Sequence, residues 1–345
     1  MDEMLRGFWY LARVGADVKR GKTAPVTLLG EQVLLGRRGD GTVFAYADCC
    51  PHRGMPLREG TFDGSTLRCC FHGWAFDSAD GRCTSIPSVV GDAEPGRFRL
   101  RAYPAREVQG NVWVFVPRPG PLPDPLPDTI PQVAHFGTSA PRTAVTMRFP
   151  CGVDLAASGF FDPGHPAFVH TSRWWRSKPV GNLRLKEKAF APDGFGFAMA
   201  RHPVKGGGLP YKLLGGDVHA EIRISLPGIR TEFIQGRRHA AYVLAAATPV
   251  NERETDVHYC VYWTPPWLTP LKPLVRMAVA DFLGQDRDVA VRLAGNPNLP
   301  PQLFVGDADT QIRWYLRLKK EFLASVSEQR PFLNPLRAQM LRWKS

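Results

Sequence analysis

Short apolar runs bounded by turn residues fill the first third of the chain. Pairs such as Gly30-Glu31 and Asp80-Gly81 separate neighbouring runs, which is typical of strands joined by tight turns. The runs lie at residues 8–12, 26–29, 32–35, 43–46, 74–77, 103–107 and 111–116. This pattern predicts an all-β unit.

Prolines are concentrated directly after this unit. Seven of the fifteen residues in 117–131 are proline, and such a segment is stiff, extended and a poor helix or central strand. It therefore predicts a domain boundary. We assign residues 1–118 to an N-terminal domain, 119–138 to a proline-rich linker and 139–345 to a second domain.

The second domain combines long alternating segments with helical periodicity. Alternation at 181–201, 217–226, 230–235, 239–249 and 256–264 predicts a large antiparallel sheet. Helices are predicted at 152–162, 271–294 and 307–325. A sheet wrapped around a long helix, with helices to one side, is an α+β arrangement.

Composition adds limits to this picture. The chain has 345 residues, 44% hydrophobic and 22% charged, which is typical of a soluble globular protein with two domains. The longest apolar run, 240–247, is far shorter than a transmembrane helix. The acidic N-terminus lacks the features of a signal peptide, so we expect a cytoplasmic protein.

The net charge is +12, but lysine and arginine are scattered and form no nucleic-acid motif. A general excess of positive surface explains this charge, and docking of an acidic electron-donor protein is the functional alternative.

The chain has seven cysteines, and this odd count argues against a secreted disulfide framework. We expect Cys49 and Cys70 to be small buried thiols, with a disulfide between their loops as the alternative.

Two arms of one cysteine and one histidine each stand out within residues 49–74. Cys50-Pro51-His52 is followed by sixteen residues and then by Cys69 and His72. Two cysteines and two histidines can bind one zinc ion, or an iron–sulfur cluster in which two histidines replace two cysteines on one iron.

Three details favour the cluster. The single residue between Cys50 and His52 is a tighter gap than zinc fingers use. Gly54 and Gly73 follow soon after the histidines, where backbone can approach a cluster. The interval between the arms is rich in turn residues, which indicates hairpin loops and not a finger helix.

The motifs Cys50-Pro51-His52-Arg53-Gly54 and Cys69-x-x-His72-Gly73-Trp74 resemble the Rieske domain of Rieske non-haem iron oxygenases. The resemblance implies a 2Fe-2S cluster bound by Cys50, His52, Cys69 and His72. It also implies that the second domain is a catalytic domain with a helix-grip, or START-like, fold.

A second motif lies in the second domain. Asp162 and His165 are three residues apart, and His170 follows five residues later, with Pro163 and Pro166 interrupting the helix. Taken alone, the two histidines could equally well be residues that cap loops and bind no metal. Together with the Rieske arms, the segment resembles the family's mononuclear iron motif, a two-histidine, one-carboxylate site with open positions for dioxygen.

The third ligand implied by the resemblance is a carboxylate in 280–291. Asp286 aligns with it, and Asp281 and Asp288 are the alternatives, each of which could simply lie on a solvated helix face. The resemblance also implies that Asp162 bonds His165 and, across a subunit boundary, His72 of a neighbouring copy, and so bridges electron transfer in a homotrimer. Residues 157–159 of this chain are Ala-Ser-Gly. The family often has an asparagine here that supports the site.

The function implied is that of an oxygenase component that uses dioxygen and single electrons. No GxGxxG unit is present, so an NAD(P)H-dependent reductase or a ferredoxin is the expected partner. The layout is closer to the vanillate O-demethylase and pheophorbide a oxygenase type, which implies hydroxylation or oxidative demethylation of a hydrophobic aromatic or sterol-like ring compound.

Four tryptophans are candidates for the walls of a substrate pocket, although ordinary core packing explains them equally well. They are Trp174, Trp175, Trp263 and Trp267. The alternative function is a Rieske electron carrier whose second domain only binds a partner.

Overall fold

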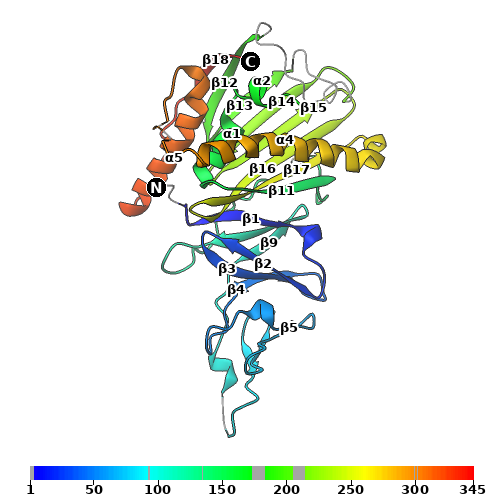
Figure 1. The fold of residues 1–345 in the computed structure, drawn as a ribbon, viewed down its shortest axis with the longest axis vertical. Coiled ribbons are helices and arrows are strands. Elements are labelled where there is room, and N and C mark those ends of the chain that lie inside the picture. The colour runs from blue at the N-terminus through cyan, green and yellow to red at the C-terminus, as the bar shows by residue number, and fades with distance from the viewer. Residues whose placement is uncertain are drawn as a thin grey trace. The chain divides into compact units, whose positions relative to one another are not determined.

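The computed structural model describes residues 4–91, 94–133, 135–172, 183–204, 214–298, 300 and 302–345. The chain divides into two compact units (Figure 1). The N-terminal unit consists of Arg6–Gln132 with Gly137–Ala140, and the C-terminal unit is built mainly from Pro141–Ser345. Most of the segment predicted as a linker, up to residue 132, groups with the N-terminal unit.

The N-terminal unit consists of three small antiparallel sheets. The first has the order β1 (Phe8–Val14), β10 (Asn111–Val116), β9 (Ala105–Val108). The second consists of β2 (Lys22–Leu28), β3 (Glu31–Arg37) and β4 (Val43–Ala47). The third consists of β5 (Thr61–Phe62), β6 (Thr66–Arg68), β7 (Ala75–Asp77) and β8 (Cys83–Ser85). The predicted all-β unit is confirmed.

The hydrophobic core of this unit reaches the two cysteine arms. Phe76 of β7 and Leu67 of β6 are almost completely buried, and they belong to the same core cluster as Cys50, Cys69 and Trp74. Burial of large apolar side chains is the main contribution to stability in a small β unit. The arms are therefore fixed at their bases by the core of the domain.

The C-terminal unit is dominated by one antiparallel sheet of eight strands. Its order is β11 (Thr143–Phe149), β17 (Glu254–Trp263), β16 (Ala240–Asn251), β15 (Ile229–Gln235), β14 (His219–Ser225), β13 (Gly196–Pro203), β12 (Leu185–Asp193) and β18 (Gln339–Lys344). Most neighbours in this order are consecutive in the chain, as expected for strands joined by hairpins.

Helices cover one face of this sheet. In the part of this unit that the structure describes, they are α1 (Val153–Phe161), α2 (Pro166–Val169), α4 (Lys272–Ala294) and α5 (Thr310–Ser327). Along β17, Val257, Tyr259 and Val261 point to α4, where Val279 and Leu283 pack against the same cluster. In Figure 1, α1 and α4 lie across the strands. The predicted α+β arrangement is confirmed, and the helices begin and end close to the expected positions.

Helix α5 is joined to the start of α1 by a buried ion pair. Lys319 is 5% exposed, and its Nζ donates to the two carboxylate oxygens of Asp154 at 2.7 and 2.6 Å. The hydroxyl of Tyr315, one turn earlier on α5, lies 3.2 Å from the same carboxylate. This pair fixes the helix that leads directly to the Asp162 motif.

Two edge strands were not predicted. Strands β11 and β18 form the two edges of the large sheet. In β18 only Leu341 and Trp343 are buried, so its alternation is too short to distinguish it from a loop. The predicted segment 181–201 is two strands, because the chain turns at Gly194, which has a φ of +52°.

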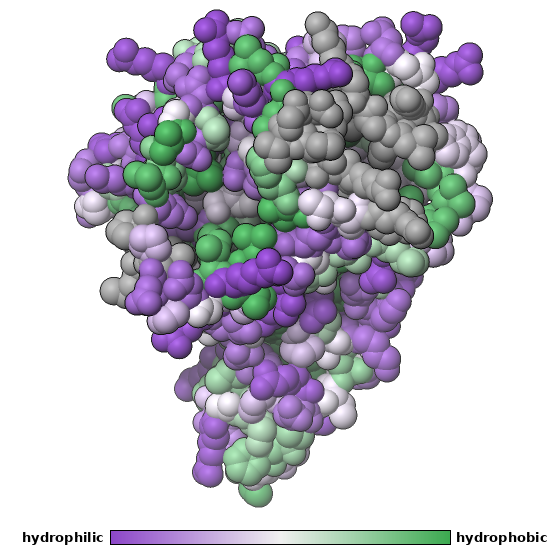
Figure 2. Space-filling model, turned by 45° about the horizontal axis from the view of Figure 1, so that its top comes forward, coloured by the Kyte–Doolittle hydropathy of each residue, from purple (hydrophilic) through white to green (hydrophobic). Residues whose placement is uncertain are grey.

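The surface carries apolar groups among many hydrophilic ones. Figure 2 shows the apolar residues of one face in separate groups. Trp267, Leu271, Leu274 and Met277 are each more than 40% exposed. Among the described residues, no helix is long and apolar enough to cross a membrane.

Candidate metal centres

The two cysteine arms of the N-terminal unit form loops with the same backbone hydrogen bonds. In the first, the N–H of Cys50 donates to the carbonyl five residues later (2.8 Å), and the N–H of Gly54 donates to the carbonyl of Cys50 (2.9 Å). In the second, Cys69 and Gly73 repeat this pattern at 2.9 and 3.1 Å. Gly54 and Gly73 have φ values of +75° and +70°, which other residues rarely adopt. The glycines therefore allow both loops to turn tightly.

The two cysteines of these loops are buried beside each other. Cys50 and Cys69 are 2% and 3% exposed. Burial, together with the neighbouring Cys69 thiol, raises the pKa of the Cys50 thiol to about 11. Such a thiol ionises at neutral pH only when a metal ion takes the place of its proton.

The two histidines lie next to each other at the loop ends. The rings of His52 and His72 are 4.6 Å apart, and His52 stacks on the indole of Trp74 at 4.7 Å. Desolvation lowers the pKa of His52, and the charges of His72 and Arg53 lower it further. A neutral imidazole is the form that binds a metal.

The four side chains form two pairs and not a single tetrahedron. A zinc site would bring all four ligand atoms within about 4 Å of one another. Over the part of the chain that the structure describes, only His165, His170 and Asp286 bring three such atoms within 4.8 Å of one another. A cysteine pair beside a histidine pair fits a cluster with two irons.

The prediction for Cys49 and Cys70 was wrong. Both residues are exposed. Cys49 precedes the buried Cys50 and Cys70 follows the buried Cys69, and the tight turns that bury one cysteine of each pair leave the other exposed.

In the C-terminal unit, the first arm of the second site begins where α1 ends. The carboxylate of Asp162 accepts hydrogen bonds from the N–H groups of Gly164 (2.7 Å) and His165 (3.3 Å). Nδ1 of His165 donates to the backbone carbonyl of Asp162 at 2.9 Å. Because a carbonyl can only accept, this bond fixes the proton on Nδ1 and leaves the lone pair on Nε2.

The second arm lies at the end of α2. His170 is 3% exposed, and its ring stacks on Phe282 of α4 at 3.7 Å with 22° between the planes. Phe282 was not among the predicted site residues. Its position four residues before Asp286 on one helix face is the sequence signal that could have indicated it.

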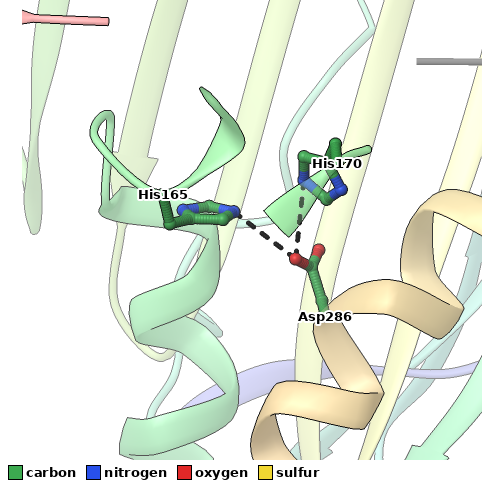
Figure 3. A group of neighbouring side chains, drawn as sticks. All are labelled: His165, His170 and Asp286. Atoms are coloured by element: carbon green, nitrogen blue, oxygen red, sulfur yellow. Dashed lines mark ion pairs between the residues drawn. The ribbon is translucent and has the colours of Figure 1, made fainter. Parts of the chain in front are cut away.

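The two arms meet at Asp286 of α4. Its Oδ1 lies 3.4 Å from Nε2 of His165 and 3.5 Å from Nε2 of His170. Figure 3 shows both rings directed at this carboxylate. The alternatives do not converge here, since Asp281 bonds Ser172 instead and Asp288 is exposed.

The chemistry of this group fits a divalent metal ion. Nε2 of His165 and both ring nitrogens of His170 are buried without a hydrogen-bond partner among the described residues. Burial lowers the pKa of His170. Burial also acts to lower the pKa of His165, but the nearby carboxylates of Asp286 and Asp162 outweigh it and raise that pKa. The two imidazoles thus share one carboxylate, and a cation there would give Nε2 of each ring and Oδ1 of Asp286 a partner.

A largely apolar cavity of about 140 Å³ adjoins this group. Asp162, His165 and Asp286 line it together with residues of α1, α4 and α5, among them Leu155 and Leu293. Trp263 and Trp267 are not among its lining residues, and Trp174 and Trp175 lie outside the described residues. Trp263 is buried on β17, and Trp267 is 44% exposed.

Comparisons with known proteins agree with this description. Residues 8–104 match the family model of the Rieske [2Fe-2S] domain. Over 121 residues, the chain is 38% identical to the terminal oxygenase component of carbazole 1,9a-dioxygenase from a Sphingomonas species, a stretch covering 34% of this chain and 32% of that protein. Over 212 residues, it is 33% identical to the oxygenase subunit of 5,5'-dehydrodivanillate O-demethylase from Sphingobium, covering 58% of this chain and 48% of that protein.

The fold also has a close counterpart among solved structures. Dicamba monooxygenase bound to dicamba superimposes with a TM-score of 0.69 at 21% identity, covering 94% of this chain and 99% of that chain. Residues 8–104 of the chain are therefore a Rieske [2Fe-2S] domain. More particularly, the chain is related to terminal oxygenase components and shares the fold of dicamba monooxygenase. The resemblance inferred from the motifs is confirmed at this level, while the aligned segments span only about a third to a half of these sequence relatives.

Proposed function

We propose that the chain is the oxygenase component of a Rieske non-haem iron oxygenase. In this role it uses dioxygen and externally supplied electrons to hydroxylate or oxidatively demethylate a hydrophobic ring compound. The observation that carries the proposal is the convergence of His165, His170 and Asp286 within 4.8 Å in a chain that also has a Rieske domain. An electron carrier would need no second metal centre.

Two groups of residues would hold the metals. Cys50, His52, Cys69 and His72 would bind the 2Fe-2S cluster, and His165, His170 and Asp286 would bind Fe(II). When bound, the cluster supplies electrons one at a time and the ferrous ion supplies a site for dioxygen chemistry.

The protein's own contribution at the second site is orientation and exclusion of water. The bond from Nδ1 of His165 to the carbonyl of Asp162 keeps Nε2 available as a ligand. The stack on Phe282 sets the plane of the His170 ring, whose Nε2 faces Asp286. The apolar walls of the adjoining cavity limit the access of water, which strengthens electrostatic interactions there.

Electrons would come from another protein. We propose an NAD(P)H-dependent reductase or a ferredoxin as the donor, because the sequence has no nucleotide-binding motif. We further propose that Asp162 bridges electron transfer between copies in a homotrimer, and that the protein is cytoplasmic. The carboxylate of Asp162 is partly exposed (31%) and lies in the lining of the cavity, which leaves it accessible for such a role.

The proposed substrate is a hydrophobic compound with an aromatic ring or a sterol-like skeleton. Support comes from the relatives, whose names refer to carbazole and to 5,5'-dehydrodivanillate, and from the structure with bound dicamba. Of the four candidate tryptophans, we propose that Trp174 and Trp175, which follow His170 in the chain, contribute to the pocket, since Trp263 and Trp267 do not line the cavity beside the three ligands. Oxidation at a methyl group and at a ring position are both consistent with the site.

A His165→Ala variant tests the proposal against the electron-carrier alternative. We expect wild-type protein to hold about one iron per chain beyond the two of the cluster. The variant should lose that iron and its oxygen uptake with a panel of aromatic methyl ethers and sterols, while the visible spectrum of the cluster stays unchanged. Wild-type protein with cluster iron only would contradict the proposal.

A further inference from the structure

The residue directly before Asp286 makes hydrogen bonds to the segment directly after His170. Oε1 of Gln285 accepts from the N–H of Thr171 at 2.9 Å and from the N–H of Ser172 at 3.3 Å. Gln285 and Asp286 are neighbours on α4, and His170 and Thr171 are neighbours in the chain. The two ligand positions, separated by 116 positions in sequence, are therefore joined one residue away from each ligand.

Asp281 closes these contacts into a ring. Nε2 of Gln285 donates to Oδ2 of Asp281 at 3.0 Å and to its backbone carbonyl at 3.1 Å. The hydroxyl of Ser172 donates to the same Oδ2 at 2.5 Å. Gln285, Ser172 and Asp281 thus form a closed hydrogen-bonded ring, in which the amide of Gln285 uses both its oxygen and its nitrogen. We call these three residues the Gln285 ring.

The His170 arm depends on such contacts from outside. Helix α2 has only four residues and ends at His170, whose φ and ψ of −85° and 76° are not helical. A helix this short has little stability of its own. In contrast, α4 has 23 residues and packs on the sheet through Val279 and Leu283. Helix α4 is therefore the rigid partner, and residues 170–172 are positioned against it.

The stack on Phe282 does not fix the position of His170 by itself. Stacked rings can slide over one another at little cost, because dispersion attraction has no strong direction. Hydrogen bonds from two successive backbone N–H groups to one side-chain oxygen restrict movement along the helix axis. The Gln285 ring therefore determines which part of α4 His170 faces.

We propose that Gln285, held by Asp281 and Ser172, is a positioning residue that sets His170 against Asp286 and thereby sets the Fe(II) affinity of the site. This inference rests on the proposed function, because it assumes that His170 and Asp286 bind iron. It assigns a role to Asp281, whose carboxylate lies on the same helix as Asp286 but bonds Ser172 and Gln285.

The chemistry of the ring allows a test by loss and rescue. Gln285→Glu keeps an oxygen toward Thr171 and Ser172 but places a second carboxylate oxygen against Asp281. Asp281→Asn can keep the ring, because its amide oxygen can accept both bonds. In the double variant, the amide nitrogen of Asn at 281 can donate both to Glu at 285 and to Ser172, so the ring closes again with reversed polarity.

The measurement is Fe(II) affinity, determined anaerobically by competition with a chromophoric chelator on protein with an intact cluster. Loss of an outer contact of this kind weakens metal binding by about 10- to 100-fold. We expect that loss for Gln285→Ala, Gln285→Glu and Asp281→Ala. Asp281→Asn and the double variant should bind Fe(II) within a few-fold of wild type. Asp288→Ala, which removes an exposed carboxylate of α4, is the matched control.

Two outcomes would overturn the inference. In one, Gln285→Ala binds Fe(II) like wild type while His170→Ala does not, which leaves the proposed function intact. In the other, all variants lose affinity in proportion to their loss in thermal stability and the double variant fails to recover, which shows that the ring only stabilises the fold. If wild type itself binds no Fe(II) beyond the cluster, the proposed function is what fails.

Discussion

The backbone carbonyl of Asp162, and not its carboxylate, is the group that fixes the ring of His165. The carbonyl lies 2.9 Å from Nδ1, whereas the nearest carboxylate oxygen is 3.8 Å away. The carboxylate instead accepts from the N–H groups that begin the next turn. The backbone carbonyl of Asp162 thus orients the ring of His165, while the carboxylate holds the negative charge. A mutation of the side chain can therefore change the charge without removing the bond that orients the ring.

The Asp162→Asn variant should retain mononuclear iron. An asparagine oxygen can accept the same N–H bonds, so the turn and the carbonyl that holds His165 should stay in place. Asp162→Ala removes those bonds and should lower iron occupancy several-fold. Iron analysis after desalting decides this, and equal iron loss in both variants would show that the charge, and not the turn, matters. If Asp162 also bridges electron transfer, Asp162→Asn should slow turnover while it keeps its iron.

The adjacent cysteine pairs provide a matched test of the cluster ligands. Cys50→Ser and Cys69→Ser should abolish the red-brown colour and acid-labile sulfide, because serine oxygen is a poor substitute for thiolate at a cluster. Cys49→Ser and Cys70→Ser alter exposed thiols one position away and should leave both unchanged. Visible absorption and sulfide analysis are sufficient. A colourless Cys49→Ser protein would contradict the assignment.

The buried ion pair between α5 and α1 should make a large contribution to stability. Lys319→Met leaves the partly buried carboxylate of Asp154 with the hydroxyl of Tyr315 but without its cation, and loss of a hydrogen bond to a charged group costs about 1.5–3 kcal/mol. The double variant Lys319→Met with Asp154→Leu should recover part of that loss, since no charge then remains buried. The free energy of unfolding, measured with urea, tests both. A Lys319→Met protein as stable as wild type would show that the pair is hydrated in solution.

The sequence predicted the chemistry of the sites better than their supporting contacts. Cys50, His52, Cys69 and His72 are recognisable because a cluster demands fixed residue types at short spacings. Asp286 could be favoured but not singled out, since three aspartates on α4 compete and only the packing of the helix decides which one faces the histidines. These ligand assignments stay predictions until the metals are measured.

The contacts that hold the sites have no local signal. Gln285 and Ser172 lie more than 100 residues apart in the sequence, and any helix surface can carry a glutamine. The stack of His170 on Phe282 likewise depends on how α2 and α4 meet. Strand β18 was not predicted for the same reason. Its two buried residues indicate a strand only when the pairing with β12 is known. Long-range packing, and not propensity, determines these features.

The pH dependence of the N-terminal unit should reflect Glu31. Burial works against ionisation of this carboxyl, but hydrogen bonds from Tyr103 and Arg6, with the charges of Arg6 and Arg101, outweigh it and lower its pKa. A carboxyl whose pKa is lower in the folded protein adds stability above its unfolded pKa of about 4.3, and that stability is lost as the pH falls through the folded pKa. Its contribution is therefore complete at neutral pH.

Glu31→Gln should accordingly destabilise the N-terminal unit at pH 7 by about 1–2 kcal/mol, the range for a hydrogen-bonded charge that is not fully buried. The difference from wild type should start to shrink as the pH falls below about 4, where the carboxyl of the unfolded wild-type chain takes up a proton, and it should disappear once the pH has fallen through the lower pKa of the folded state. Denaturation followed by tryptophan fluorescence at pH 3, 4, 5 and 7 measures this, with Glu59→Gln, an exposed carboxylate of the same unit, as the control. A constant difference across this pH range would mean that Glu31 acts through packing and not through its charge.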